Sequence, residues 1–196
     1  MGNRCAKLKR ATYETDISVS VDIDGTGKSD IDTGIGFLDH MLTLFSKHGI
    51  IDLMAKARGD LNVDFHHTVE DIGIVLGKCL SDALADKTGL KRYGTSFLPM
   101  DETLALVSVD ISGRPFLAYD CKMNTQKVGD FDTELVEEFF RAVAFNAGIT
   151  LHIKLMYGSN SHHIIEAVFK AFGRALREAA TRDDRVVGLM TTKGVI

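Results

Sequence analysis

Alternating apolar and polar residues predict a half-buried strand near the start of the chain. The apolar positions are Ile17, Val19, Val21 and Ile23, with serine or aspartate between them. A period of two is typical of a strand that buries one face. The strand ends at an Asp24-Gly25 turn, so we expect a hairpin whose second strand returns antiparallel through Ile31.

Further along the chain, segments with helical spacing alternate with short strand-like segments. In chain order we predict a helix over 37–47 ended by Gly49, a strand over 50–57, a helix over 66–84, strands over 103–110 and 116–120, a helix from 135 that ends at Gly148, a strand over 150–156 and a helix that begins near 162. The helices carry apolar residues three and four positions apart, which predicts one buried face on each.

One pentapeptide pattern occurs twice, as His66-His67-Thr68-Val69-Glu70 and as His162-His163-Ile164-Ile165-Glu166, with matched positions 96 residues apart. We call these the first and second arrays. The match continues down both helices, for example from Gly77 to Gly173. We therefore predict an α+β fold formed by internal duplication of a half that contains a sheet and two helices. The predicted halves are 1–93 and 94–196, packed as one compact unit.

Each array has the spacing of a metal-binding motif. The glutamate follows the two histidines by four and three positions, so it shares a helix face with each of them. Adjacent histidines diverge by roughly 100° on a helix, which favours two metal ions over one. Surface histidines at a helix start are the structural alternative, and the duplication argues against it. Imidazole and carboxylate ligands without thiolate leave Mn, Fe, Zn, Co and Ni open.

Three single histidines are weaker candidates. His40 lies on the predicted helix 37–47, and His152 lies on the polar face of strand 150–156, turned away from its own core. Together they would raise the possible ligand set to eight, although a single histidine is more often a packed or hydrogen-bonded residue. His48, which precedes Gly49, is equally plausible as a residue that stabilises the C-terminal end of its helix.

Composition excludes several classes of function. The 196 residues carry a net charge of −4, and no Lys/Arg stripe interleaves with aromatic residues, so nucleic-acid binding has little support. No apolar run approaches membrane-spanning length. The three cysteines are widely spaced and form no CxxC motif. They indicate a reducing compartment, and we expect the cytoplasm.

Five segments together match one known family. They are Thr33–Met41 (TGIGFLDHM), Asp64–Asp71 (DFHHTVED), Ser112–Phe116 (SGRPF), Asn160–Ala167 (NSHHIIEA) and Thr192–Val195 (TKGV). Over nearly its whole length the chain resembles imidazoleglycerol-phosphate dehydratase of histidine biosynthesis. The resemblance implies a fold like the second domain of ribosomal protein S5. It also implies a lyase that dehydrates D-erythro-imidazoleglycerol phosphate to imidazoleacetol phosphate.

The resemblance also implies the site residues. Two Mn²⁺ ions per active site would be held by His40, His66, His67, Glu70, His152, His162, His163 and Glu166. Substrate contacts would come from Glu14, His40, His48, His66, His67, Glu70, Arg92, Arg114, Lys170, Thr192 and Lys193. A dimanganese-bound imidazolate would expel the hydroxyl to give a diazafulvene intermediate. Glu14 would then take the carbon-bound proton, and Glu70 and Glu166 would assist proton transfer.

The family assembles as a shell of twenty-four identical subunits with active sites at subunit boundaries, and we expect the same here. Metal removal should then loosen the assembly. The location would be the plastid if the chain comes from a plant and has lost a transit peptide. Two other functions remain open, a dinuclear metallohydrolase and a non-catalytic metal-binding shell protein. Neither would need the imidazole of the substrate.

Overall fold

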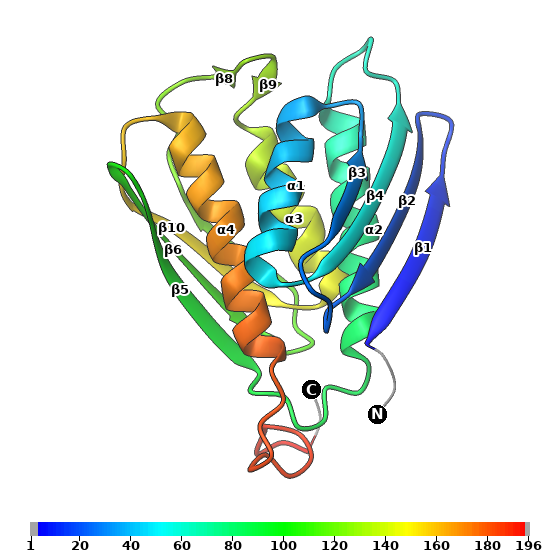
Figure 1. Ribbon diagram of the computed structural model, residues 1–196, viewed down its shortest axis with the longest axis vertical. Helices are drawn as coiled ribbons and strands as arrows, with labels where there is room; N and C mark the ends of the chain where they lie inside the picture. The colour runs from blue at the N-terminus through cyan, green and yellow to red at the C-terminus, as the bar shows by residue number, and fades with distance from the viewer. Residues whose placement is uncertain (1–3, 195–196) are drawn as a thin grey trace.

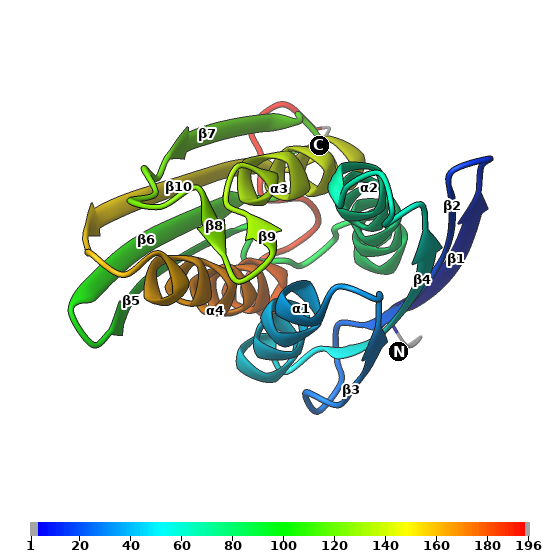
Figure 2. The same ribbon diagram turned by 90° about the horizontal axis from the view of Figure 1, so that it is seen from above.

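Two four-stranded sheets enclose four helices in the residues that this computed structural model describes, 4–194 (Figures 1 and 2). The first half contains β1 (Cys5–Ala11), β2 (Thr15–Asp22), β3 (Ser29–Asp32), α1 (Gly36–Gly49), β4 (Asp52–Gly59) and α2 (His66–Leu84). The second half contains β5 (Tyr93–Met100), β6 (Thr103–Asp110), β7 (Phe116–Asp120), β8 (Lys127–Val128), β9 (Phe131–Asp132), α3 (Leu135–Ala147), β10 (Thr150–Tyr157) and α4 (Ser161–Ala180). Val195 of the terminal motif lies outside the described residues.

The two halves share one topology. The sheet orders are β1-β2-β4-β3 and β5-β6-β10-β7, which are the same order in corresponding strands. In each sheet the first three strands pair antiparallel, and the last strand pairs in parallel with its neighbour. The small β8–β9 ribbon is an addition to the second half. The predicted α+β class and the internal duplication are therefore confirmed.

The predicted hairpin through Ile31 is wrong. Ile31 belongs to β3, which pairs in parallel with β4 at the far edge of the sheet, with Ile31 opposite Ala55. Both sides of β2 are already taken by β1 and β4. The carboxylate of Asp52 accepts hydrogen bonds from the backbone N–H groups of Thr26 (2.7 Å) and Lys28 (2.9 Å). These bonds hold the segment before β3 against the start of β4, so that β3 continues along β4 and not along β2.

Strands β1 and β5 were not predicted because their inner faces carry few large apolar side chains, Leu8 in β1 and Leu98 and Met100 in β5. None of the residues of β1 is fully buried. In β5, Gly94 and Ser96 are buried while Tyr93 and Phe97 are exposed, the reverse of the expected pattern. The reason is the close approach of α4, since a Cβ on Gly94 would lie 2.0 Å from the carbonyl oxygen of Ala175.

The helices pack in two pairs between the sheets, α2 against α3 and α1 against α4 (Figure 2). The repeat glycines permit this contact. A Cβ on Gly77 would lie 2.7 Å from the carbonyl oxygen of Val143, and one on Gly173 would lie 2.6 Å from that of Phe45. Helices α2 and α4 begin at the same end of the molecule (Figure 1). Among the described residues, no helix is long and apolar enough to cross a membrane.

Candidate active site

Both arrays lie in the first turns of their helices, α2 and α4. Asn160 caps α4, since its Oδ1 accepts hydrogen bonds from the backbone N–H groups of His162 (2.9 Å) and His163 (3.4 Å). At the start of α2, Asp64 Oδ1 accepts a hydrogen bond of 2.7 Å from the backbone N–H of His66. The side chains of the histidines therefore project from fixed helix ends at one end of the molecule.

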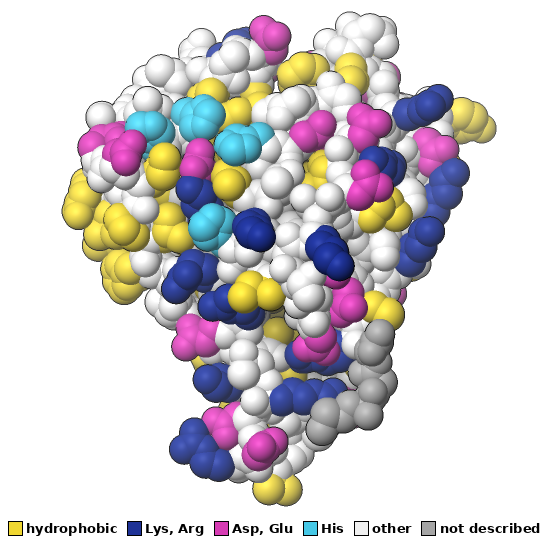
Figure 3. Space-filling view, in the orientation of Figure 1, with side chains coloured by type: hydrophobic (Ala, Val, Ile, Leu, Met, Phe, Trp, Pro, Cys, Tyr) yellow, Lys and Arg dark blue, Asp and Glu magenta, His cyan; other side chains and the backbone are white. Residues whose placement is uncertain are grey.

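The second array forms a compact donor group with a histidine from α1. His40 Nε2 lies 3.5 Å and His162 Nε2 3.3 Å from Glu166 Oε2. Among the described residues this is the one group of three whose donor atoms all lie within 4.8 Å of each other. Histidine side chains gather over α1 and α4 beside acidic side chains on this face (Figure 3). Two converging imidazoles and a carboxylate fit a divalent ion of the first transition series.

Glu166 is the buried member of this group, and Lys170 pairs with its other oxygen. Burial opposes ionisation of Glu166. The hydrogen bond and charge of Lys170, followed by those of His40, outweigh this burial and lower the pKa of the carboxyl. The carboxyl of Glu166 is therefore anionic at neutral pH, while the imidazoles of His40 and His162 remain partly exposed.

The first array is more open. His66 Nε2 lies 4.0 Å from Glu70 Oε2, and the side chain of Glu70 is 46% exposed. His67 instead pairs through Nδ1 with Asp60 Oδ2 at 2.9 Å. Glu14 Oε2, in the β1–β2 hairpin, lies 3.9 Å from the same Nδ1. The hydrogen bond to Asp60, followed by the charge of Glu14, raises the pKa of His67 against the effect of burial.

His163 differs from its neighbour His162 in direction. Its Nδ1 pairs with Glu102 Oε2 at 2.8 Å, in the β5–β6 hairpin. This hydrogen bond raises the pKa of His163 and, together with the backbone N–H of Asn160, holds the pKa of Glu102 well below its usual range. Asp60 and Glu102 were not among the predicted site residues. Their positions in the sequence were the available signal. Asp60 directly follows β4, and Glu102 directly precedes β6 at Thr103, just as Glu14 directly precedes β2 at Thr15.

His152 is exposed on the outer face of β10, as its strand pattern predicted. Its nearest ring neighbour is Phe116, with the ring centroids 6.4 Å apart. It is not part of the His40–His162–Glu166 group. The eight predicted metal ligands are thus not gathered into one site within a single chain.

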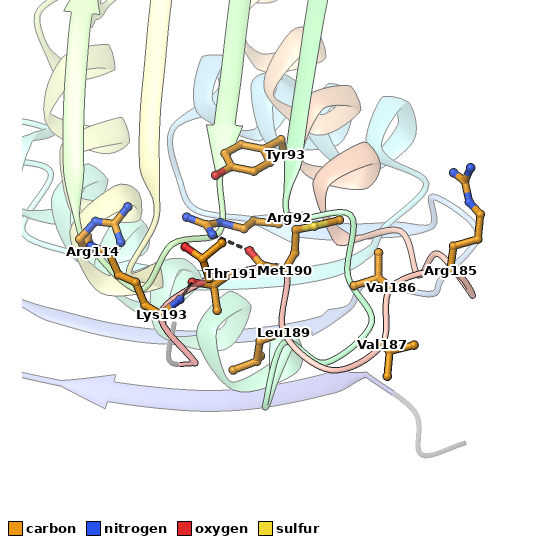
Figure 4. A pocket seen from close by; sticks show the side chains of 11 residues that line it. Arg92, Tyr93, Arg114, Arg185, Val186, Val187, Leu189, Met190, Thr191 and Lys193 are labelled. Atoms are coloured by element: carbon orange, nitrogen blue, oxygen red, sulfur yellow. Dashed lines mark hydrogen bonds between the residues drawn. The ribbon is translucent and has the colours of Figure 1, made fainter.

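A cavity of about 600 Å³ next to the C-terminal segment brings most of the predicted phosphate-binding residues together. It is lined by Arg92, Arg114, Thr192 and Lys193. Figure 4 shows the two arginines and Lys193 side by side around the segment. Arg92 is held by Asp110 (Nε to Oδ1, 2.7 Å) and by the carbonyl of Met190 (2.7 Å). The cavity is cationic and suits an anion such as a phosphate.

Two of the predicted substrate contacts lie elsewhere. Lys170 and His48 line a smaller cavity together with Arg174, on the flank of the second array. Burial, followed by the charges of Lys170 and Arg174, lowers the pKa of His48. His48 is therefore neutral at pH 7, and it can donate or accept a hydrogen bond there.

The arrays and the Arg92 cavity lie at opposite ends of α4. The backbone N–H of Arg92 donates to the carbonyl of Ala179, in the last turn of the helix. Because a helix rises 1.5 Å per residue, Ala179 lies roughly 25 Å from His162. A ligand much shorter than this separation cannot contact both places in one chain.

A third cavity borders the second array. It measures about 520 Å³, and its wall includes Phe37, Phe65, Phe131, His40 and His162. Phe37 meets the ring of His162 edge-on, with centroids 5.3 Å apart. Since Phe65 directly precedes His66, this cavity lies between the two arrays.

Comparison with known proteins gives one family. A family model described as imidazoleglycerol-phosphate dehydratase matches residues 33–176. Relatives of that name from Acetivibrio thermocellus and Clostridium novyi are 61% and 63% identical, over 99% and 98% of this chain and 100% and 98% of their own. The crystal structure of the Staphylococcus aureus enzyme, 51% identical, covers 91% of this chain and 99% of its own with a TM-score of 0.84. The Pyrococcus furiosus structure, 41% identical, covers 96% and 100% with a TM-score of 0.83.

Proposed function

The chain belongs to the imidazoleglycerol-phosphate dehydratase family, hydro-lyases of histidine biosynthesis, and from this we propose that it converts D-erythro-imidazoleglycerol phosphate to imidazoleacetol phosphate with two Mn²⁺ ions per active site. The observation that carries the metal part is the convergence of His40, His162 and Glu166. Further ligands would come from the first array, from His163 and from His152. Bound between two divalent ions, the imidazole of the substrate would lose its N–H proton, and the resulting imidazolate would expel the hydroxyl to give a diazafulvene.

Glu14 is the proposed base for the carbon-bound proton. It is exposed, and it lies within 4 Å of the first array without a hydrogen bond to His67. A carboxylate in that place is free to take a proton from substrate bound at the array. Loss of hydroxide from the ring-bound carbon and of this proton from the next carbon removes one water, and the enol product becomes the ketone. Glu70 and Glu166 would assist proton transfer as well as bind metal.

We also propose that each active site is shared between subunits of a twenty-four-subunit shell. The separation of roughly 25 Å between the arrays and the Arg92 cavity supports this, because the phosphate must then be held by a different copy. Arg92, Arg114, Thr192 and Lys193 would bind that phosphate. The exposed position of His152, away from both arrays, supports a role as ligand in a neighbouring copy.

The reaction is tested by removing metal with a chelator, restoring Mn²⁺ and following imidazoleacetol phosphate, with Glu14→Gln in parallel. We expect metal-dependent turnover that falls by at least about 10²-fold in Glu14→Gln, in line with loss of a general base. Release of phosphate from simple phosphate esters would favour the metallohydrolase. Binding of Mn²⁺ without either reaction would favour the metal-binding shell protein.

Site sharing is tested by mixing two inactive variants, His162→Ala and Arg114→Ala. Each alone damages every site. In a shell assembled from equal amounts of both, about a quarter of the sites would combine an intact array with an intact cation cavity if two random copies build each site. Activity should therefore return to roughly that fraction of wild type. No recovery in mixed shells would mean that each site is built within one chain.

A further inference from the structure

The second histidine of each array is held by a carboxylate that comes from outside the array. His67 Nδ1 lies 2.9 Å from Asp60 Oδ2, and His163 Nδ1 lies 2.8 Å from Glu102 Oε2. A carboxylate that accepts from Nδ1–H leaves the Nε2 lone pair free for a metal and makes that nitrogen a stronger donor.

The two carboxylates are not equivalent in the repeat. Asp60 lies in the connection between β4 and α2, residues 60–65, whereas the matching connection between β10 and α4 is only residues 158–160. Glu102 instead lies in the hairpin before β6. In the other half, the matching hairpin position before β2 is Glu14. The hairpin position whose glutamate pairs with an array histidine in the second half, Glu102, is thus occupied in the first half by the proposed base, Glu14.

We propose that Asp60 and Glu102 are positioning residues that orient His67 and His163 toward the metals, and that Asp60 takes over this role in the first half so that Glu14 is free to act as the base. This inference rests on the proposed function. Glu14 Oε2 lies 3.9 Å from His67 Nδ1, beyond hydrogen-bond range, while Asp60 fills the contact. The backbone N–H of Asp60 also donates to the carbonyl of Glu14 at 3.1 Å. This hydrogen bond connects the proposed base to the residue that pairs with His67 in its place.

The surroundings of the two carboxylates support this division. Glu102 uses Oε1 for the backbone N–H groups of Ser159 (3.2 Å) and Asn160 (2.8 Å), so it fixes the start of α4 and the ring of His163 together. Oδ1 of Asp60 is buried and has no hydrogen-bond partner among the described residues. A buried carboxylate oxygen without a partner is destabilising, so the placement of Asp60 is one that fold stability alone does not favour.

The test measures Mn²⁺ binding to the chelator-treated full-length protein without substrate, for wild type, Asp60→Asn, Glu102→Gln and Glu14→Gln. Loss of an outer carboxylate that orients a metal-bound histidine weakens metal affinity about 10- to 100-fold. We expect this loss in Asp60→Asn and in Glu102→Gln. Glu14→Gln, the matched control at the equivalent hairpin position, should bind Mn²⁺ within about twofold of wild type while its turnover is lost.

Glu102→Gln also separates positioning from a purely structural role. The amide oxygen of Gln can still accept from Ser159 and Asn160, so a structural role would be preserved and Mn²⁺ affinity would stay at the wild-type value. Nitrogen-15 spectra of the histidine rings give a second readout. The wild-type Nδ1–H form of His163 should be lost in Glu102→Gln, as should that of His67 in Asp60→Asn.

Wild-type affinity and unchanged ring tautomers in both carboxylate variants would overturn this inference, even if the dehydratase assay succeeds. Weaker binding by Glu14→Gln to the same extent as Glu102→Gln would also overturn it, because the two hairpin glutamates would then share one role. Absence of Mn²⁺-dependent turnover in wild type would instead overturn the proposed function. The wild-type dehydratase assay, run on the same preparation, therefore distinguishes the two failures.

Discussion

The two arrays have the same sequence pattern but different surroundings. In the second array, Glu166 is buried, pairs with Lys170 and faces His40 of α1. In the first, the side chain of Glu70 is 46% exposed and lies 4.0 Å from His66. Among the described residues, no side chain of α3 joins the first array in a compact group of metal-binding atoms. The first half therefore supplies His40 to the array of the second half, whereas the second half supplies no equivalent residue to the first array among the described residues. The more open array is the one beside the proposed base, where a substrate needs access.

The missing counterpart of His40 can be identified from the register of α1 and α3. Ile51 donates to the carbonyl of Ser46 after α1, and Ile149 donates to that of Ala144 after α3. In this register Glu138 corresponds to His40. Glu138 is paired with Arg141 of its own helix at 3.7 Å. The duplication alone thus does not give two equal metal sites.

The sharpest test of this asymmetry exchanges each of these matched residues for alanine. His40→Ala should lower Mn²⁺-dependent turnover by at least about 10³-fold, because a metal site supplies several kcal/mol to such a reaction. Glu138→Ala should change turnover by less than about twofold, since its pair with Arg141 is exposed and weak. Steady-state rates at saturating Mn²⁺ measure both. Equal losses in the two variants would mean that α3 serves the first array as α1 serves the second.

The next test compares the two glutamates as structural residues. Glu166→Ala leaves Lys170 with its charge nearly buried, so the chelator-treated protein should lose about 2–4 kcal/mol of unfolding free energy. Glu70→Ala removes an exposed side chain and should change it by less than about 0.5 kcal/mol. Denaturant unfolding monitored by circular dichroism gives both values.

The control for this stability test removes the stranded charge. Lys170→Met added to Glu166→Ala should recover most of the lost free energy, since the buried ammonium is then absent. If the double variant is no more stable than Glu166→Ala, the loss comes from packing around the carboxylate and not from the unpaired charge.

Much of the fold follows from the sequence because its buried faces are regular. The helix 66–84 and the strands 103–110 and 116–120 are observed with the predicted bounds. Strand β5 was not predicted because the first two residues of its inner face are Gly94 and Ser96, which make room for α4, before the buried Leu98. The path of the chain into β3 was not predicted because it depends on hydrogen bonds from the backbone of Thr26 and Lys28 to Asp52, more than twenty positions away in the sequence.

The site shows the same division between local and long-range information. The spacing within each array is local, and it predicted that Glu166 would approach His162. The hydrogen bonds of Asp60 and Glu102 depend on how the strand connections fold over the helix ends, which the spacing within each array does not predict. The residues in the Arg92 cavity came from the resemblance to a family, and their gathering in space depends on the C-terminal segment.

The smallest effect concerns His48, which lies beside the second array and has Lys170 and Arg174 as neighbours. Burial and these two charges lower its pKa from the ordinary value of 6.5 in the folded state. Folding therefore favours neutral His48. Its contribution to stability is fully present above pH 6.5 and is lost as the pH falls below that value toward the folded-state pKa. His67 and His163, whose pKa values are raised, act in the opposite direction.

The difference between wild type and His48→Gln isolates this contribution from those of the other histidines. The melting temperatures of the two chelator-treated proteins should differ by a constant amount above pH 7. Below pH 6.5, wild type should lose stability relative to His48→Gln, by a fraction of a kcal/mol because His48 is only partly buried. Adding Lys170→Met should shrink the pH-dependent part, since one of the two neighbouring cations is removed. A difference that stays constant down to pH 5 would mean that the cations beside the second array do not act on His48.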